Sequence, residues 1–152
     1  MTEPMTEPQT IVVGLDGSAH SWHALRWAVD RAARTGARVR AVHAWQVPNA
    51  PYGPGPFVAM SPPVDDLERD ARDALDAELR SVVTEFDEVD IDGVVTAGAT
   101  AEVLLDEARH ADLLVVGQRG RGGFTGLLLG SAADQVVRHA HCPVVVVPHD
   151  GS

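Results

Sequence analysis

The segment GQRGRGGFTGLLLGS at residues 117–131 holds the residue types best suited to bind an anion, namely six glycines, two arginines and a final serine. Glycine allows the backbone to approach a ligand closely, and consecutive amides in such a segment can surround an anion. A helical pattern follows, so Gly130 and Ser131 would lie at a helix N-terminus, where free amides and the helix dipole favour phosphate. Arg119 and Arg121 would add positive charge. We expect a phosphate-binding loop; the alternative is a flexible loop before a helix that Ser131 caps.

A second candidate residue, Asp16, follows the first apolar run in the segment Gly14-Leu15-Asp16-Gly17. An aspartate there either contacts a ligand or stabilises an Asp-Gly turn, and the two roles are compatible. The P-loop pattern is absent, and so is G-x-G-x-x-G after the first strand, which disfavours P-loop hydrolases and Rossmann dehydrogenases. All 12 basic residues are arginine, which excludes mechanisms that need a lysine amine.

Other residues with chemical potential carry less weight. His20 with His23, and His139 with His141, lack cysteine or carboxylate partners at recognised metal-ligand spacing, so we interpret them as solvated histidines. Cys142 is the single cysteine, which excludes an internal disulfide and fits a reducing compartment.

The elements that must position these residues alternate between apolar runs and helical periods. Helices are expected from Ser18 to a stop at Gly36, from near Ser61-Pro62 past Phe86, from a cap at Thr100, and from Ser131. The proline-rich stretch 46–62 is expected to be a long loop. Strands are expected at residues 11–13, 39–45, 89–97, 113–116 and 144–147.

This alternation predicts an α/β fold: a five-stranded, parallel, doubly wound sheet with helices on both faces. Covering both faces requires the strand order to reverse once, and ligands bind at the carboxyl ends of the strands where it does. The first strand ends at Asp16 and the fourth ends at Gly117. We therefore place the reversal between them, which gives the order 3-2-1-4-5.

The spacing of the glycines is more specific than their number. Gly117, two residues, Gly120, nine residues and then Gly130-Ser131 resembles the nucleotide-binding loop of the universal stress proteins. IVVGLDGSAHSWHALRWA resembles the opening strand and helix of that family, and HCPVVVVP resembles its last strand. The similarity spans roughly residues 9 to 148 and implies the adenine nucleotide alpha-hydrolase-like fold.

The resemblance also implies a binding site for ATP with Mg²⁺. Asp16 matches an aspartate that contacts the ribose or a metal–phosphate unit, Gly14 the position beneath the adenine, and Ala44 the residue whose backbone reads the adenine edge. The expected ATP-binding residues are Gly14, Asp16, Ala44, Gly98, Val116, Gly117, Gln118, Arg119, Gly120, Arg121, Gly122, Gly123, Gly130, Ser131 and Ala132. Gly98-Ala99, after the third strand, and Val116 are expected to line the base pocket, and Asp16 is also the expected Mg²⁺ residue, through the phosphates.

The last strand is expected to lie at an edge of the sheet, where an apolar strand invites pairing. Pairing of Val144, Val145, Val146 and Val147 with a second copy would give a two-fold homodimer, as the resemblance also implies. Residues 9–149 are expected to form a single universal-stress-type nucleotide-binding domain, and residues 1–8 a disordered tail.

The bulk charge limits the possible partners. The formal net charge is −10, which disfavours non-specific binding to nucleic acid and to an anionic membrane. The N-terminal sequence MTEPMTEP has neither a basic start nor an apolar run, so it does not read as a signal peptide. We expect a cytoplasmic protein.

These observations favour an ATP-binding regulatory module that responds to stress through an unknown protein partner. A slow ATPase is the first alternative, although no residue besides Asp16 offers a carboxylate at the motif, so at most weak hydrolysis is expected. A nucleotide-free interaction module of the same fold is the second alternative. A flavodoxin-like carrier is more remote.

Overall fold

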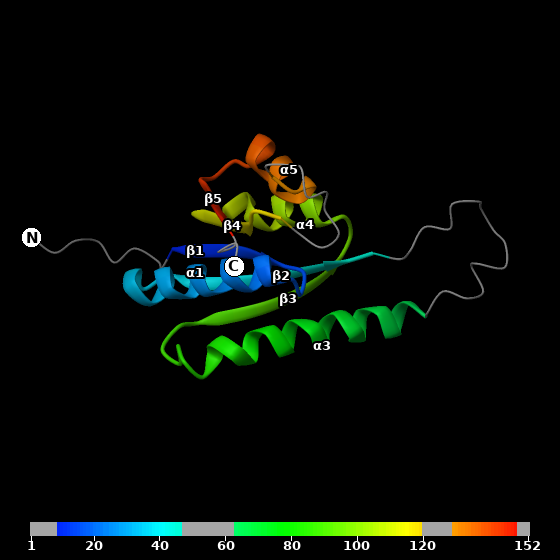
Figure 1. Cartoon of the computed structure of the whole chain (residues 1–152), viewed down its shortest axis with the longest axis horizontal. Coiled ribbons are helices and arrows are strands. Elements are labelled where there is room, and N and C mark those ends of the chain that lie inside the picture. The colour runs from blue at the N-terminus through cyan, green and yellow to red at the C-terminus, as the bar shows by residue number, and fades with distance from the viewer. Residues whose placement is uncertain (1–8, 47–62, 120–128, 149–152) are drawn as a thin grey trace, which may run out of the picture.

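The computed structural model of the chain describes residues 9–46, 63–119 and 129–148. Its sheet contains β1 (Thr10–Leu15), β2 (Arg38–Trp45), β3 (Ile91–Ala97), β4 (Leu113–Gly117) and β5 (Val144–Val147). The strands are parallel and lie in the order β3-β2-β1-β4-β5, as Figure 1 shows. The predicted fold class and the predicted reversal between the first and fourth strands are therefore confirmed.

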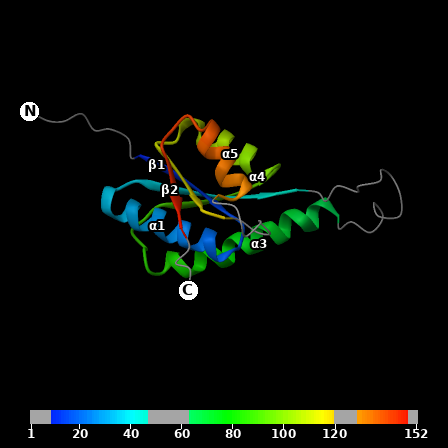
Figure 2. The same ribbon diagram turned by 45° about the horizontal axis from the view of Figure 1, so that its top comes forward.

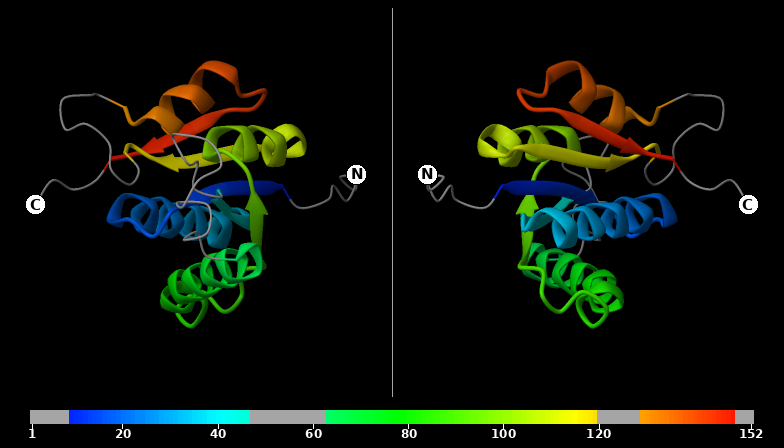
Figure 3. Two further views of the ribbon diagram at one scale, coloured as in Figure 1. Left: turned by 90° about the vertical axis from the view of Figure 1, so that its right-hand side faces the viewer. Right: turned by 90° about the vertical axis from the view of Figure 1, so that its left-hand side faces the viewer.

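Helices cover both faces of this sheet (Figure 3). α1 (Ala19–Thr35) and α3 (Val64–Val83) lie on one face; α4 (Thr100–Glu107), the short 3₁₀ turn η1 (Ala108–His110) and α5 (Ser131–His139) lie on the other. Figure 2 shows α4 and α5 side by side, away from α1 and α3. Right-handed βαβ crossovers produce this arrangement when the strand order reverses at one point.

Alternation along β1 and β2 divides the core into two layers. Val13 and Val39 belong to the layer under α1 and α3, whereas Val12 and Val42 belong to the layer under α4 and α5. All four side chains are at most 1% exposed. Successive side chains of a strand point to opposite faces, so a strand buried on both faces reads as a continuous apolar run.

The predicted element boundaries hold where a local signal sets them. α1 begins after the N-cap Ser18, whose side chain accepts a hydrogen bond from the Ser21 amide, and ends at Gly36 in the left-handed conformation with φ 78°. The helix predicted to start near Ser61-Pro62 is present as α3, which begins at Val64 with Pro63 at its N-cap. Ser61 and Pro62 lie outside the described residues.

Smaller differences remain at other boundaries. β1 spans Thr10–Leu15 rather than residues 11–13, β2 begins at Arg38 rather than at residue 39, and β3 begins at Ile91 rather than at residue 89. α3 ends at Val83, so Phe86 packs on the core from beyond the helix. The expected tail at 1–8 and the expected loop at 47–62 lie outside the described residues. Within the described ranges, no helix is both long enough and apolar enough to cross a bilayer.

Two glycines allow close packing at the carboxyl edge of the central strands. A Cβ on Gly117 would lie 2.8 Å from the carbonyl oxygen of His20, so α1 approaches β4 at a distance that no side chain permits. A Cβ on Gly14 would lie 2.7 Å from Cδ1 of Leu104 in α4. Neither glycine has a positive φ, so packing accounts for them. His20 is half-buried at this contact, and the interpretation of it as a solvated surface histidine was wrong.

We expect Gly117→Ala to lower the free energy of unfolding by about 2 kcal/mol, because the new methyl group meets the backbone of α1 and forces the helix to move. Gly14→Ala is the matched control. It meets only the end of the flexible Leu104 side chain, so its loss should be about 1 kcal/mol or less. Urea unfolding measures both, and equal losses would contradict this account of Gly117.

Candidate functional site

The main candidate site is a cleft of about 590 Å³ at the carboxyl edge of the sheet. This size is typical of small-molecule sites. Its walls come from the ends of β1 and β2 and from the first turns of α4 and α5. The lining residues are Asp16, His43, Ala44, Gln46, Ala99, Thr100, Ala101, Glu102, Gly130, Ser131, Ala132 and Gln135.

A smaller cavity of about 40 Å³ lies at the same edge, where β1 and β4 end. It shares Asp16, Thr100 and Ala132 with the cleft, so the two are neighbouring parts of one site. Its further lining residues are Gly14, Leu15, Ser21, Leu104, Val116, Gly117, Arg119 and Ala133. The site therefore lies at the reversal of strand order, where open α/β sheets bind ligands.

The turn between β1 and α1 fixes the backbone around Asp16. Oδ1 of Asp16 accepts a hydrogen bond from the Ser18 amide at 2.9 Å, and Gly17 between them has φ 83°. Oγ of Ser18 in turn accepts from the Ser21 amide at 3.2 Å. Asp16 thus takes part in an Asx turn and also lines both cavities.

Two helix N-termini meet in the cleft. The first residues of α4 and of α5 both line it, and the amides of a first helical turn have no partner within the helix. The N-cap residues are Ala99 and Gly130, and neither helix has a side-chain cap. The predictions that Thr100 and Ser131 cap these helices were therefore wrong. Each is the first residue of its helix, so neither hydroxyl serves as the cap.

A backbone hydrogen bond joins the two ends of segment 118–130. The Gly130 amide donates a hydrogen bond to the carbonyl of Gln118 at 2.8 Å, and the Gln118 amide donates to the carbonyl of Val147 at 2.9 Å. Gly130 itself is extended, with φ −66° and ψ 165°. These bonds hold the start of α5 next to the end of β4. The position of the first turn of α5 at the cleft therefore depends on β4.

The charges at the cleft suit an anionic ligand held partly by a cation. Asp16 and Glu102 are the acidic side chains that line the cleft, and Arg119 lines the small cavity beside it. The described residues contain no group of three or more metal-binding side chains. Mg²⁺ is commonly held by one or two carboxylates together with substrate phosphates and water, so Asp16 fits a metal bound mainly through a ligand's phosphates.

The structure brings most of the described predicted residues together. Asp16, Ala44, Gly130, Ser131 and Ala132 line the cleft, and Gly14, Val116, Gly117 and Arg119 line the small cavity.

Two predicted residues lie differently. Gly98 and Gln118 line neither cavity in the described part of the chain. Gly98, with φ 142°, leaves no room for a Cβ beside Val103. Gly120, Arg121, Gly122 and Gly123 lie outside the described residues.

Sequence reasoning missed six residues of the cleft wall. They are His43, Gln46, Thr100, Ala101, Glu102 and Gln135. All but Gln135 lie at or just beyond the carboxyl ends of β2 and β3, so the rule that drew attention to Asp16 could have found them too. Gln135 lies one helical turn beyond Ser131 on α5, and that spacing is its only signal in the sequence.

A cavity of similar size, about 600 Å³, lies at the opposite, amino edge of the sheet. Its guanidinium group at Arg40 is already engaged, because Nε lies 2.6 Å from Glu107 and Nη1 lies 3.0 Å from Asp92. These contacts, that with Glu107 first, raise the pKa of Arg40 above its usual value. Arg38 also lines this cavity, but so do the carboxylates of Asp90, Asp92, Asp106 and Glu107. Because these negative charges disfavour an anion there, we take the carboxyl edge as the candidate site.

This chain is similar to known proteins over nearly its whole length. The model of the universal stress protein family matches residues 7–148. A universal stress protein of Mycolicibacterium smegmatis is 36% identical over 137 residues, which are 90% of this chain and 45% of that protein. The chain thus spans about half the length of the curated relatives it matches.

Solved structures of universal stress proteins are also similar to this chain. Universal stress protein UspA from Lactobacillus plantarum superposes with a TM-score of 0.77 at 24% identity, covering 94% of this chain and 99% of that one. A universal stress protein solved in complex with cAMP is 32% identical, with a TM-score of 0.58, covering 91% of this chain and 95% of that one.

The serines at the two helix starts should differ in their effect on stability. Ser18→Ala removes a cap whose oxygen accepts from the Ser21 amide, so we expect a loss of about 1 kcal/mol. Ser131→Ala removes a hydroxyl that does not cap α5, so we expect a change within about 0.5 kcal/mol. Thermal and urea unfolding of the ligand-free variants measure both, and a loss at Ser131 as large as that at Ser18 would refute the assignment.

Proposed function

The chain belongs to the universal stress protein family, and from this premise we propose that it binds an adenine nucleotide, ATP with Mg²⁺, in the cleft at the carboxyl edge of the sheet. The observation that carries the proposal is the meeting of two uncapped helix N-termini beside Asp16 in one cleft of about 590 Å³. The cAMP complex of a relative at 32% identity supports an adenine nucleotide as the class of ligand.

In this proposal the backbone supplies most of the recognition. The first-turn amides of α5, next to Ser131, bind phosphate oxygens, and Arg119 adds positive charge from the small cavity. Ala44 presents its backbone to the adenine edge, and Asp16 contacts the ribose or Mg²⁺ held by the phosphates. Backbone amides can bind phosphate oxygens without a basic side chain. A chain with a net charge of −10 and no lysine can therefore still bind a polyphosphate in this way.

The nucleotide acts as a signal in this proposal, and the protein is a cytoplasmic stress-response module that presents a different surface to a protein partner when loaded. A ligand shifts such an equilibrium only by its different affinity for the two states. Slow ATP hydrolysis is the second candidate, and it rests on Asp16 as a carboxylate at the phosphate end of the cleft. Turnover above about 1 s⁻¹, the low end of ordinary enzymes, would favour that candidate.

The binding test places a negative charge where the phosphates are proposed to lie. Ala132 lies in the first turn of α5 and lines both cavities. Like-charge repulsion at this partly buried position should make Ala132→Glu weaken ATP binding at least tenfold. Val137→Glu is the matched control, since Val137 is 47% exposed on the same helix, and its affinity should stay within twofold.

Calorimetry with ATP and Mg²⁺ measures both variants, and AMP and cAMP serve as competing ligands. Mass spectrometry of material released from freshly purified protein identifies the natural occupant. A wild-type protein that carries and binds no adenine nucleotide would refute the proposal and favour a nucleotide-free interaction module.

We further propose a homodimer through Val144–Val147. β5 pairs only with β4 among the described strands. The carbonyl of Pro143, just before β5, accepts from the Leu114 amide, and the carbonyl of Val147 accepts from the Gln118 amide, just after β4. The N–H and C=O groups of successive residues point to opposite sides of a strand. Those of Val144 and Val146 therefore point away from β4, to the open edge of the sheet. A second copy of β5 can pair there.

Light scattering should therefore give twice the 16.1 kDa of one chain. Val146→Pro removes an outward N–H without breaking a bond to β4 and should give the single-chain mass. A wild-type mass of one chain at micromolar concentration would contradict the dimer.

A further inference from the structure

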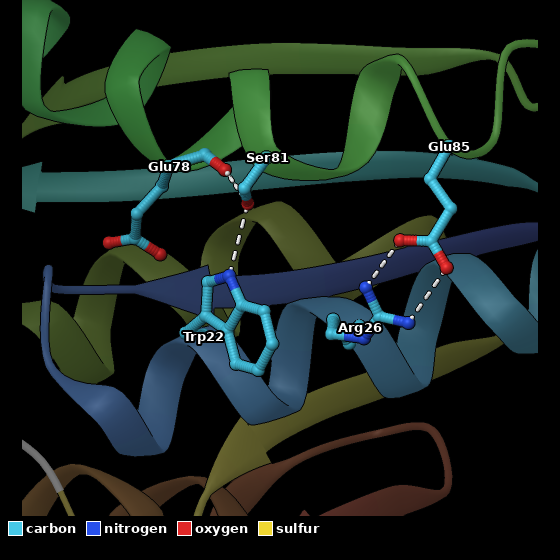
Figure 4. A network of polar contacts seen from close by, with 5 residues as sticks. All are labelled: Trp22, Arg26, Glu78, Ser81 and Glu85. Atoms are coloured by element: carbon cyan, nitrogen blue, oxygen red, sulfur yellow. Dashed lines mark hydrogen bonds and ion pairs between the residues drawn. The ribbon is translucent and has the colours of Figure 1, made fainter.

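The carboxylate of Glu78 crosses from α3 to the N-terminus of α1. Oε2 of Glu78 lies 3.3 Å from the hydroxyl of Ser21, and Ser21 is only 4% exposed. Figure 4 shows Glu78 pointing from α3 toward the first turn of α1, next to the loop that joins β1 to α1. Glu78 therefore contacts the turn that holds Asp16 from the side opposite the cleft.

This contact supplies a charge that α1 lacks. The first turn of α1 contains no acidic residue, although free amides and the helix dipole give every helix N-terminus a partial positive charge. Glu78 brings a negative charge to that end from another helix. An acidic residue in the first turn of α1 itself could do the same without depending on where α3 lies.

A chain of hydrogen bonds connects Glu78 to Asp16. The Ser21 hydroxyl lies 3.3 Å from Oε2 of Glu78 and 3.1 Å from the Ser18 carbonyl oxygen, so its one hydrogen is shared between them. The Ser21 amide donates to Oγ of Ser18 at 3.2 Å, and the Ser18 amide donates to Oδ1 of Asp16 at 2.9 Å. Gly17 lies between Asp16 and Ser18 at φ 83°. Because glycine adopts many conformations, a contact from outside the turn adds to the bond between Ser18 and Asp16 in holding Gly17 in this one.

Packing of α1 against α3 does not by itself require a half-buried carboxylate. Burial raises the pKa of Glu78, hydrogen bonds from the Gly17 backbone and from Ser21 offset only part of that rise, and the nearby carboxylate of Asp16 adds to it. α1 is also joined to α3 by Trp22, which donates to Ser81 at 3.0 Å, and to the turn after α3 by Arg26, whose guanidinium lies 2.6 and 3.0 Å from the carboxylate of Glu85. Figure 4 shows the Arg26–Glu85 pair farther along α1 than Glu78, whereas the Trp22–Ser81 bond lies beside Glu78.

We propose that Glu78 is a positioning residue that fixes the β1–α1 turn from α3 and thereby orients Asp16 toward the nucleotide. The part of this inference that concerns binding rests on the proposed function. Glu78 itself lies outside the lining of both cavities, so it acts through the turn and not on the ligand.

The first experiment measures amide hydrogen exchange in the ligand-free protein. Glu78→Leu keeps the size of the side chain but removes its oxygens, and Glu78→Gln keeps an oxygen acceptor. We expect exchange at Gly17 and Ser18 to be at least tenfold faster in Glu78→Leu and largely restored in Glu78→Gln, with Val13 in the core of β1 unchanged.

Glu85→Gln is the matched control, because it weakens the other carboxylate contact to α1, which comes from the turn directly after α3. It should leave exchange at Gly17 and Ser18 unchanged. Equal acceleration in Glu78→Leu and Glu85→Gln, or none in Glu78→Leu, would overturn the proposal in favour of plain helix packing. If Glu78→Leu does not fold, Glu78→Ala also removes both carboxylate oxygens and gives the same readout.

The second experiment is a double-mutant cycle on the affinity for ATP with Mg²⁺. Glu78→Leu should weaken binding about fivefold to tenfold in the wild-type background and less than twofold in Asp16→Ala, because a residue that acts through Asp16 has no effect once Asp16 is gone. An equal loss in both backgrounds, or no loss in the wild-type background, would refute the link to Asp16.

The two experiments separate the inference from the proposed function. If the wild-type protein binds no adenine nucleotide, the proposed function fails, and exchange at Gly17 and Ser18 still decides whether Glu78 fixes the turn. If nucleotide binds and the cycle is additive, the proposed function stands and the positioning role fails.

Discussion

The reversal of strand order between β1 and β4 is the constraint on which the rest of the structure depends. It arises because a parallel sheet must be covered on both faces, and it separates α1 from α5 at the carboxyl edge. The close contact of Gly117 with the backbone of His20 sets how near α1 comes to β4. The cleft, the Asp16 turn and the start of α5 all take their positions from this one place in the sheet.

The strands and their order could be predicted from the sequence because their signals are local. Each run of apolar residues marks a strand buried on both faces, and Ser18 and Gly36 mark the ends of α1. The starts of α4 and α5 were misplaced by one residue, since a hydroxyl residue after alanine or glycine suits the N-cap and the first helical position equally well. Only the three-dimensional path of the chain selects between them.

The role of Glu78 could not be predicted, because it depends on how α3 lies against α1. In the sequence it is one acidic residue among many on a helix with a solvated face, and its contact at Ser21 joins residues 57 apart. The cleft residues beyond β2 and β3 were within reach, since the same edge rule applies to every strand. The attention given to glycine spacing drew the prediction to β1 and β4 and away from that half of the wall.

The bond from the Gly130 amide to the carbonyl of Gln118 closes the intervening segment at its base. The entropy of closing a loop depends only weakly on its length, and here the ends are joined by the backbone whatever side chains lie between. The junction between β4 and α5 is therefore a main-chain contact that substitution of a side chain leaves in place. The first turn of α5 keeps its distance from the sheet by backbone geometry, which makes its position a property of the fold and not of any one side chain.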